Sequence, residues 1–251
     1  GCTTAANILE SKSPLFPEYQ DATYEDIDFY NGLSKKRYDI VKKYAEKNWE
    51  QFYSIKVSDL LSAYLLSLSK DRMADFIFNS YTGNSPTKKE IKRLLKKGVF
   101  KNNYIVSNFS DFQKHILDHK VDKRLKKKRQ GLFIRYLKLV RKFTNDFKKE
   151  LGNDLYISTY QAAGLSVRKL GKVHSNYEEL EFKPDNVFHL PETINRIVKI
   201  IRAVKGSAFI VVDAIRNPYE ARFFRDRYSA FYLVSINATS KYRNKSPRCK
   251  D

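Results

Sequence analysis

Two short apolar runs flank an amphipathic segment near the carboxyl end of the chain. The first, residues 208–212, is uninterrupted and ends at Asp213, which is typical of a strand buried on both faces of a parallel sheet. The segment 219–227 has helical periodicity, and the second apolar run covers residues 230–236. The order strand, turn, helix, strand predicts a βαβ unit and therefore an α/β fold.

The turn after the first run carries the candidate chemistry. Asn217, Pro218 and Glu220 fit the N-cap, the first position and the third position of a helix. Ligands of open α/β sheets bind beyond the carboxyl ends of the strands. We therefore expect three residues on a ligand-binding edge: Asp213, Arg216 and Asn237.

Strands and helices expected before and after the middle of the chain also favour an α/β fold. Residues 52–57 and 155–158 are expected to be strands, and Ser58 and Asp59 are expected to cap the helix that continues through Leu68. Two more helices are expected: residues 160–170, which carry Arg168, and the amphipathic segment 191–205.

The middle of the chain differs from both flanks because its pattern is helical throughout. Helices are expected from Pro86 to Gly98, from Ser110 or Asp111 onward, and over residues 121–151 before Gly152. We divide the chain accordingly into four parts: 1–70, the helical insertion 71–152, 153–240, and a basic tail 241–251.

Charge singles out the same insertion. The chain holds 48 Lys and Arg against 28 Asp and Glu, a net charge of +20, and residues 86–149 contribute 21 basic and 5 acidic residues to it. The long helix 121–151 has one apolar stripe and basic residues on its other faces: Lys126, Lys127, Lys128, Arg129, Arg135, Lys138, Arg141 and Lys142.

Two interpretations of this basic surface stay open. It is either an ordinary solvated helix face or a docking surface for nucleic acid or protein across residues 86–149. In the nucleic-acid case, stacking rings would come from Tyr104, Phe133 and Tyr136.

Cysteine content and hydropathy indicate the cellular compartment of the protein. Cys2 and Cys249 are the only cysteines, which cannot form a disulfide framework and favours the cytoplasm. No window has the ~20 apolar residues of a membrane span, so we expect no membrane contact. The chain begins with Gly1 and its only methionine is Met73, from which we expect a segment of a longer protein.

The first four residues, GCTT, match the end of a phosphate-binding loop of the pattern GxxxxGK[ST]. Gly1 would be its last glycine and Thr3 its magnesium-binding hydroxyl. Cys2 stands where the pattern has lysine, so the charge that assists phosphoryl transfer is missing.

Five segments occur in an order that resembles a known family: GCTTAA, FYSIKVSDLL, YQAAGLSVRKLG, LPETINRIVKIIR and IVVDAIRNPYEARFFRDRYSAFYLVSINA. The order resembles the P-loop, deoxynucleoside-monophosphate-kinase-like domain of anti-phage cytidine (dCTP or dCMP) deaminases. The resemblance covers residues 1–10, 49–69 and 155–240. It implies a three-layer P-loop NTPase fold with a parallel sheet, into which the basic all-helical segment is inserted.

The resemblance also implies roles for individual residues. It implies Mg²⁺ held by Thr3 and Asp213, with Asp213 and Arg216 as the catalytic pair. It further implies that ATP or a dNTP is bound by a larger group: Gly1, Cys2, Thr3, Thr4, Ser58, Asp59, Arg168, Asn237 and Arg243, with Arg248 beside Arg243 as a lid arginine.

The function expected from these features is nucleotide binding in a cytoplasmic anti-phage protein that forms homo-oligomers. The zinc deaminase signatures HxE and PCxxC are absent from the sequence, so deamination would belong to an attached domain outside it. Two alternatives remain: an active deoxynucleotide kinase, which the loss of the loop lysine weakens, and a nucleic-acid-binding module.

Overall fold

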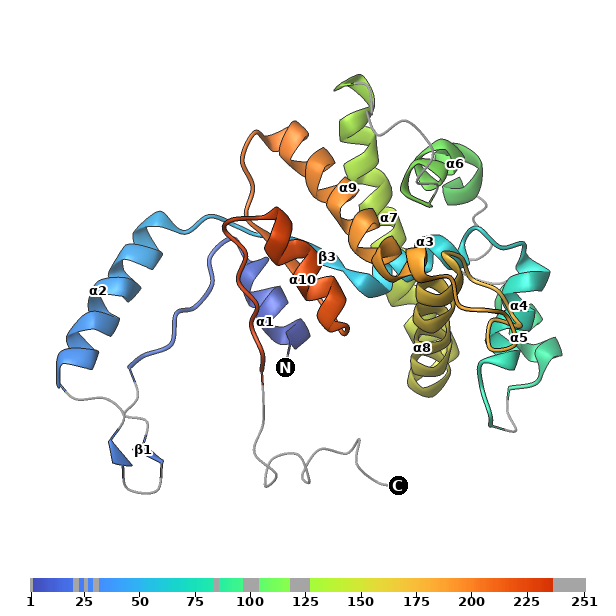
Figure 1. Cartoon of the computed structure of the whole chain (residues 1–251), viewed down its shortest axis with the longest axis horizontal. Coiled ribbons are helices and arrows are strands. Elements are labelled where there is room, and N and C mark those ends of the chain that lie inside the picture. The colour runs from blue at the N-terminus through green and yellow to red at the C-terminus, as the bar shows by residue number, and fades with distance from the viewer. Residues whose placement is uncertain are drawn as a thin grey trace.

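The structure is a computed structural model that describes residues 2–19, 23–24, 27–28, 32–83, 86–96, 104–117 and 127–236. Figure 1 shows a helical body from which α2 extends to one side. The elements follow in chain order: α1 (Cys2–Leu9), β1 (Thr23–Tyr24), β2 (Ile27–Asp28), α2 (Gly32–Asn48), β3 (Tyr53–Lys56), α3 (Val57–Leu65), α4 (Lys70–Asn79), α5 (Lys88–Leu94), α6 (Tyr104–Leu117), α7 (Lys127–Leu151), α8 (Asn153–Leu170), η2 (Pro184–Phe188), α9 (His189–Lys205), β4 (Ile210–Asp213) and α10 (Pro218–Arg227).

Strands β3 and β4 form a parallel pair although more than 150 residues separate them in the sequence. The register aligns Tyr53 with Ile210 and Lys56 with Asp213, so both strands end at the same edge. Helix α1 packs against both strands. The apolar runs at 52–57 and 208–212 therefore correctly predicted two strands, and the second ends at Asp213 as expected.

The expected three-layer parallel sheet is wrong. The described residues are mainly helical, and β3 and β4 are the only parallel pair among them; β1 and β2 form a separate antiparallel pair. Residues 155–158 belong to helix α8, not to a strand. The buried positions Leu155, Thr159, Ala163 and Val167 recur every four residues, so helical packing overrode the local strand preference.

The second strand of the predicted βαβ unit does not form either. Residues 231–236 follow α10 without joining either sheet, and Tyr232 and Val234 are 86% and 73% exposed. An apolar segment becomes a strand only when a neighbour supplies backbone hydrogen bonds, and no described strand lies alongside this one. The unit is therefore a strand followed by a helix.

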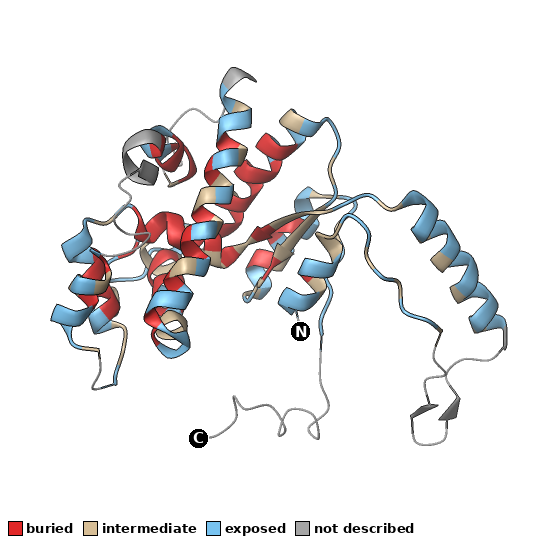
Figure 2. Cartoon of the chain, turned by 180° about the vertical axis from the view of Figure 1, so that it is seen from behind, coloured by how far each residue is buried: buried red, intermediate tan, exposed pale blue. Residues whose placement is uncertain are grey.

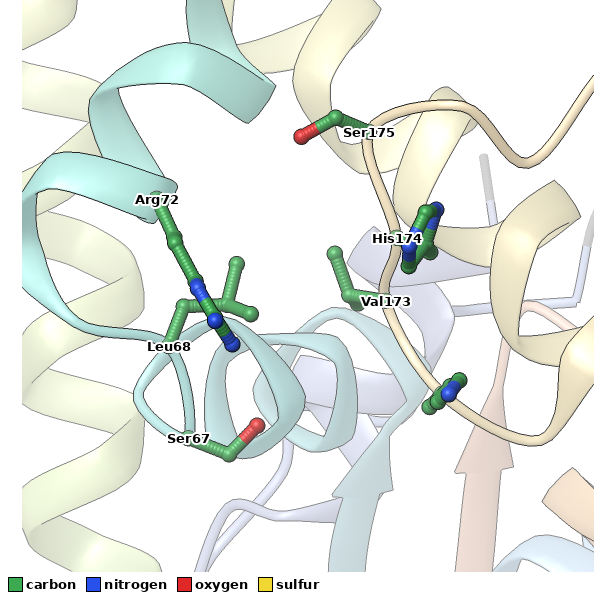
Figure 3. A pocket seen from close by; sticks show the side chains of 7 residues that line it. Ser67, Leu68, Arg72, Val173, His174 and Ser175 are labelled. Carbon is green, nitrogen blue, oxygen red and sulfur yellow. The ribbon is translucent and has the colours of Figure 1, made fainter.

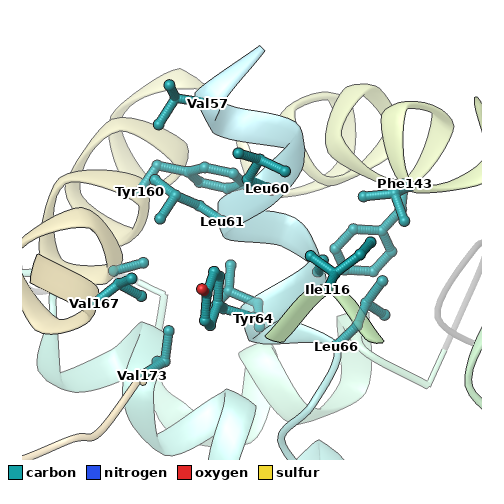
Figure 4. Close-up of a cluster of buried hydrophobic side chains, with 14 of the residues drawn as sticks. Val57, Leu60, Leu61, Tyr64, Leu66, Ile116, Phe143, Tyr160, Val167 and Val173 are labelled. Atoms are coloured by element: carbon teal, nitrogen blue, oxygen red, sulfur yellow. The ribbon is translucent and has the colours of Figure 1, made fainter. Parts of the chain in front are cut away.

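Helix α3 is the centre of the hydrophobic core. All of its residues except Ser58 are buried, and it packs against α6, α7, α8 and β3. Figure 4 shows its apolar side chains reaching residues of α7 and α8. Inside this contact the Ser62 hydroxyl hydrogen-bonds to Thr144 Oγ1 (2.8 Å) and to the Tyr160 hydroxyl (2.5 Å). Figure 2 shows buried residues concentrated along α3, α8 and α9, whereas α2 is largely exposed.

The insertion contributes aromatic rings to the same core. Phe133 and Tyr136 on α7 are fully buried and pack against Phe109 and Phe112 on α6, which bends at Phe109. Burial raises the pKa of the Tyr136 hydroxyl. Rings in this position cannot stack on nucleic-acid bases, so that role is wrong for Phe133 and Tyr136; the side chain of Tyr104 lies outside the described part.

Among the described helices, none combines the length and the apolar character that a membrane crossing requires.

Candidate functional site

The amino end of α1 faces the carboxyl ends of β3 and β4. At the start of β3, the Phe52 amide donates to the carbonyl oxygen of Leu9 at the end of α1 (3.0 Å). At the end of β3, Lys56 Nζ donates to Asn7 Oδ1 (3.0 Å), and Thr3 precedes Asn7 by one helical turn. Helix α1 therefore runs back along β3 and brings Cys2, Thr3 and Thr4, all exposed, towards Asp213. We call this region, together with the amino end of α3, the strand edge.

Asp213 has the most unusual environment at the strand edge. It is the last residue of β4, it is only 7% exposed, and its Oδ1 has no hydrogen-bond partner among the described residues. The next residue, Ala214, has a φ of 76°, a conformation that non-glycine residues rarely adopt. Buried polar atoms without a partner and strained backbone both concentrate at ligand sites.

The amino end of α3 supplies two more of the predicted residues. The helix begins at Val57, directly after β3, and its N-cap Lys56 makes no side-chain capping bond. Ser58 and Asp59 therefore lie in the first turn, and the expectation that they cap the helix is wrong. Ser58 instead lies close enough to Tyr156 of α8 to lower the pKa of its hydroxyl.

Tyr156 is a site residue that the sequence interpretation missed because it assigned residues 155–158 to a strand. Burial raises the pKa of the Tyr156 hydroxyl, the charges of Asp59 and Asp213 raise it further, and Ser58 and Arg216 oppose the shift. Four of the predicted site residues, Ser58, Asp59, Asp213 and Arg216, thus influence the pKa of the Tyr156 hydroxyl. Two of them lie on α3, one ends β4, and Arg216 lies in the turn that follows β4.

Arg141 holds the insertion against the strand edge. Its guanidinium donates to Asp59 Oδ2 (2.9 Å), to Glu10 Oε1 (2.5 Å) and to the Ser54 carbonyl oxygen (2.6 Å). Burial raises the pKa of Asp59, and Arg141 opposes this shift. Burial lowers the pKa of Arg141, but the two carboxylates raise it by more. The sequence placed Arg141 on the basic outer face of α7; the structure turns it inward.

Arg168 is tied to a buried carboxylate. Its Nε donates to Glu220 Oε1 (2.7 Å), and Glu220 Oε2 accepts from the Arg216 amide (3.4 Å). Arg168 Nη2 is buried without a hydrogen-bond partner among the described residues. The side chain of Arg216 is exposed, and Asn217 caps α10 as the sequence predicted by accepting from the Tyr219 amide (2.9 Å).

Other predicted site residues, namely Gly1, Asn237, Arg243 and Arg248, lie outside the described part. Within the described ranges, no three His, Cys, Asp or Glu side chains come together as a metal site. A magnesium ion at the strand edge would therefore rest on Asp213, Thr3, water and the ligand's own oxygens. This donor set fits Mg²⁺, which is usually bound by one or two protein carboxylates plus phosphate and water.

Comparison of the chain with protein-family models, with curated proteins and with solved structures found no match. The resemblance to the anti-phage deaminases accordingly stays a prediction. The geometry of the strand edge is the remaining basis for assigning a function.

Proposed function

We propose that this protein binds a nucleotide with Mg²⁺ at the strand edge. The observation that carries the proposal is Asp213, a buried carboxylate at the end of a parallel strand with an oxygen that has no partner among the described residues. A carboxylate desolvated in this way is costly unless a cation or a donor completes its coordination. A metal ion with its water shell would supply both.

The residues around Asp213 suit the phosphates of such a ligand. The amino end of α1 presents backbone amide groups and the positive end of the helix dipole, which favour phosphate. The Thr3 hydroxyl is available to the metal ion, and the exposed Arg216 side chain is available to a phosphate. Arg168 would contribute little to binding, because Glu220 holds its Nε and the Gly164 carbonyl oxygen accepts from its Nη1.

Binding without phosphoryl transfer is the function that this set supports best. Cys2 cannot supply the positive charge that a lysine gives to the transferring phosphate, and the half-buried Arg141 and Arg168 are already neutralised by carboxylates. We therefore place nucleotide sensing ahead of kinase activity. Through the family resemblance, the bound nucleotide would regulate an attached zinc deaminase domain.

The basic face of α7 is a second candidate surface, for nucleic acid. Arg135 and Lys138 are exposed and form no ion pair with the described residues. Since the rings of Phe133 and Tyr136 are buried, any binding here would depend on charge alone. Such binding would weaken steeply with salt and show no base preference.

The test of the proposal is equilibrium binding of fluorescent ATP and dCTP analogues to this chain, with and without Mg²⁺. We expect Asp213→Asn to weaken binding at least tenfold, roughly the effect of disturbing a metal's coordination, and to remove the dependence on Mg²⁺. Thr3→Ala should weaken it less. Asp226→Asn is the control, because Asp226 is an exposed residue of α10 and its replacement removes the same charge.

Equal affinity of the parent and the Thr3→Ala, Asp213→Asn double variant would refute the proposal. A parallel assay measures transfer of a labelled γ-phosphate from ATP to dCMP. If transfer occurred, kinase activity would be favoured over nucleotide sensing.

A further inference from the structure

A second candidate site lies at the opposite end of α3 from the strand edge. Here a cavity of about 470 Å³ opens between the segment that joins α3 to α4 and the loop that follows α8. Figure 3 shows Arg72 on one wall and Val173, His174 and Ser175 on the other, with Leu68 between them. We call this space the α3–α8 cavity.

The lining of the α3–α8 cavity is positively charged. Arg72 and Lys172 contribute two permanent charges and His174 a third nitrogen donor, and the lining contains no carboxylate. Neither Arg72 nor Lys172 forms an ion pair with any other residue that the structure describes. The neighbouring acid, Asp71, is held by Lys92 of α5 (2.7 Å) and so does not neutralise Arg72.

His174 and Ser175 are the polar residues on the loop side of the lining, and in Figure 3 the His174 ring lies on the side of its loop away from Arg72. His174 Nδ1 accepts from the Asn176 amide (3.2 Å), so the proton of the neutral ring is on Nε2, which can donate. Ser175 points towards the open space in Figure 3. The Ser67 hydroxyl donates to the Tyr64 carbonyl oxygen (2.6 Å) and is therefore already used.

We propose that the α3–α8 cavity binds a small phosphate monoester. Two fixed cations without a carboxylate match the double negative charge of a phosphate ester better than the single charge of a carboxylate. Donors on opposite walls suit the three terminal oxygens of a phosphate, which point in different directions. The apolar surface of Leu68 and Val173 would contact the ester's organic group.

This site is separate from the strand edge. Helix α3 has nine residues, so its two ends lie on the order of 13 Å apart. The proposal therefore holds or fails independently of nucleotide binding at Asp213.

The test uses phenyl phosphate as the probe and backbone amide NMR of the chain as the readout. We expect saturable shifts of the Val173, His174 and Ser175 amides, with weaker binding of inorganic phosphate, which lacks the apolar group. The Arg72→Gln, Lys172→Gln double variant should lose at least tenfold in affinity. The Arg37→Gln, Lys43→Gln variant of α2 is matched in charge and exposure and should bind as the parent does.

All four cations in these two variants are exposed, so neither variant is expected to unfold the chain, and a dispersed spectrum checks this. Equal affinity of the two double variants would overturn the proposal. Shifts confined to Asp213 and its neighbours would overturn it as well, because the probe would then bind at the strand edge.

Discussion

The two ends of helix α3 use arginine in opposite ways. At the strand edge, Arg141 is bound to Asp59 and Glu10, and Arg168 is bound to Glu220, whose side chain is only 4% exposed. At the α3–α8 cavity, Arg72 is exposed and forms no ion pair with any described residue.

The difference separates structural cations from cations available to a ligand. Arg141 connects α7 to β3, to α3 and to Glu10, the residue after α1, and Arg168 connects α8 to α10. Each therefore joins segments that are far apart in the sequence. A charge that is already balanced contributes little attraction for an anionic ligand. Arg72 and Lys172 at the cavity are not balanced by a carboxylate, so they still attract an anionic ligand. Replacing these two residues should leave the fold intact.

The largest expected effect comes from Arg168→Met. Loss of this guanidinium leaves Glu220 buried without its partner, which costs about 3–5 kcal/mol of unfolding free energy for a broken buried pair. Chemical denaturation monitored by circular dichroism measures the change.

The matched variant at the other end is Arg72→Met, which should stay within about 0.5 kcal/mol of the parent, as exposed substitutions usually do. If both variants lost the same free energy, the division into structural and available cations would be wrong.

A smaller effect is expected from Ser62→Ala, in the buried middle of α3. Ser62 is fully buried, and its hydroxyl joins Thr144 and Tyr160. Its removal should cost about 1–2 kcal/mol, since Thr144 and Tyr160 lose a buried hydrogen-bond partner. Urea unfolding of the two proteins gives this difference.

Ser67→Ala serves as the control at the cavity end. Among the described residues, its hydroxyl bonds only to the Tyr64 carbonyl oxygen of its own turn, and the residue is exposed. If Ser67→Ala lowered the unfolding free energy as much as Ser62→Ala does, burial would not explain the difference between the two serines.

The smallest effect is a pH dependence at Asp59. Burial raises its pKa above the ordinary 3.8, although Arg141 opposes this. A carboxyl whose pKa is raised by folding stabilises the protein fully below its unfolded pKa, and this contribution is lost as the pH rises through the folded pKa. The parent should therefore lose stability relative to Asp59→Asn as the pH rises from about 3.

Glu90→Gln should show the opposite trend. The Thr87 amide and hydroxyl lower the pKa of exposed Glu90 below 4.5, so its contribution is present above pH 4.5 and lost as the pH falls through the folded pKa. Unfolding free energies of the three proteins across the acidic range provide the comparison. Parallel curves for both variants would contradict the assigned environments.

Local sequence predicted the elements whose signals are local. Asn217 and Pro218 begin α10 because a side-chain cap and a fixed φ act within one turn. The apolar face of residues 191–205 correctly predicted most of α9, and the apolar runs predicted β3 and β4. In each case, the residues that decide the structure are neighbours in the chain.

Tertiary contacts decided the rest. Residues 155–158 became helical because α3 offers them a packing partner, and Arg141 turned inward because three oxygens from distant segments converge on it. The α3–α8 cavity combines residues about a hundred positions apart, a juxtaposition that no periodicity records. Sequence alone thus predicted β3, β4, most of α9, the start of α10 and the acidic residue at the end of β4. Only the tertiary structure determined which arginines form ion pairs with carboxylates, because an ion pair depends on the distance between segments that are far apart in the sequence.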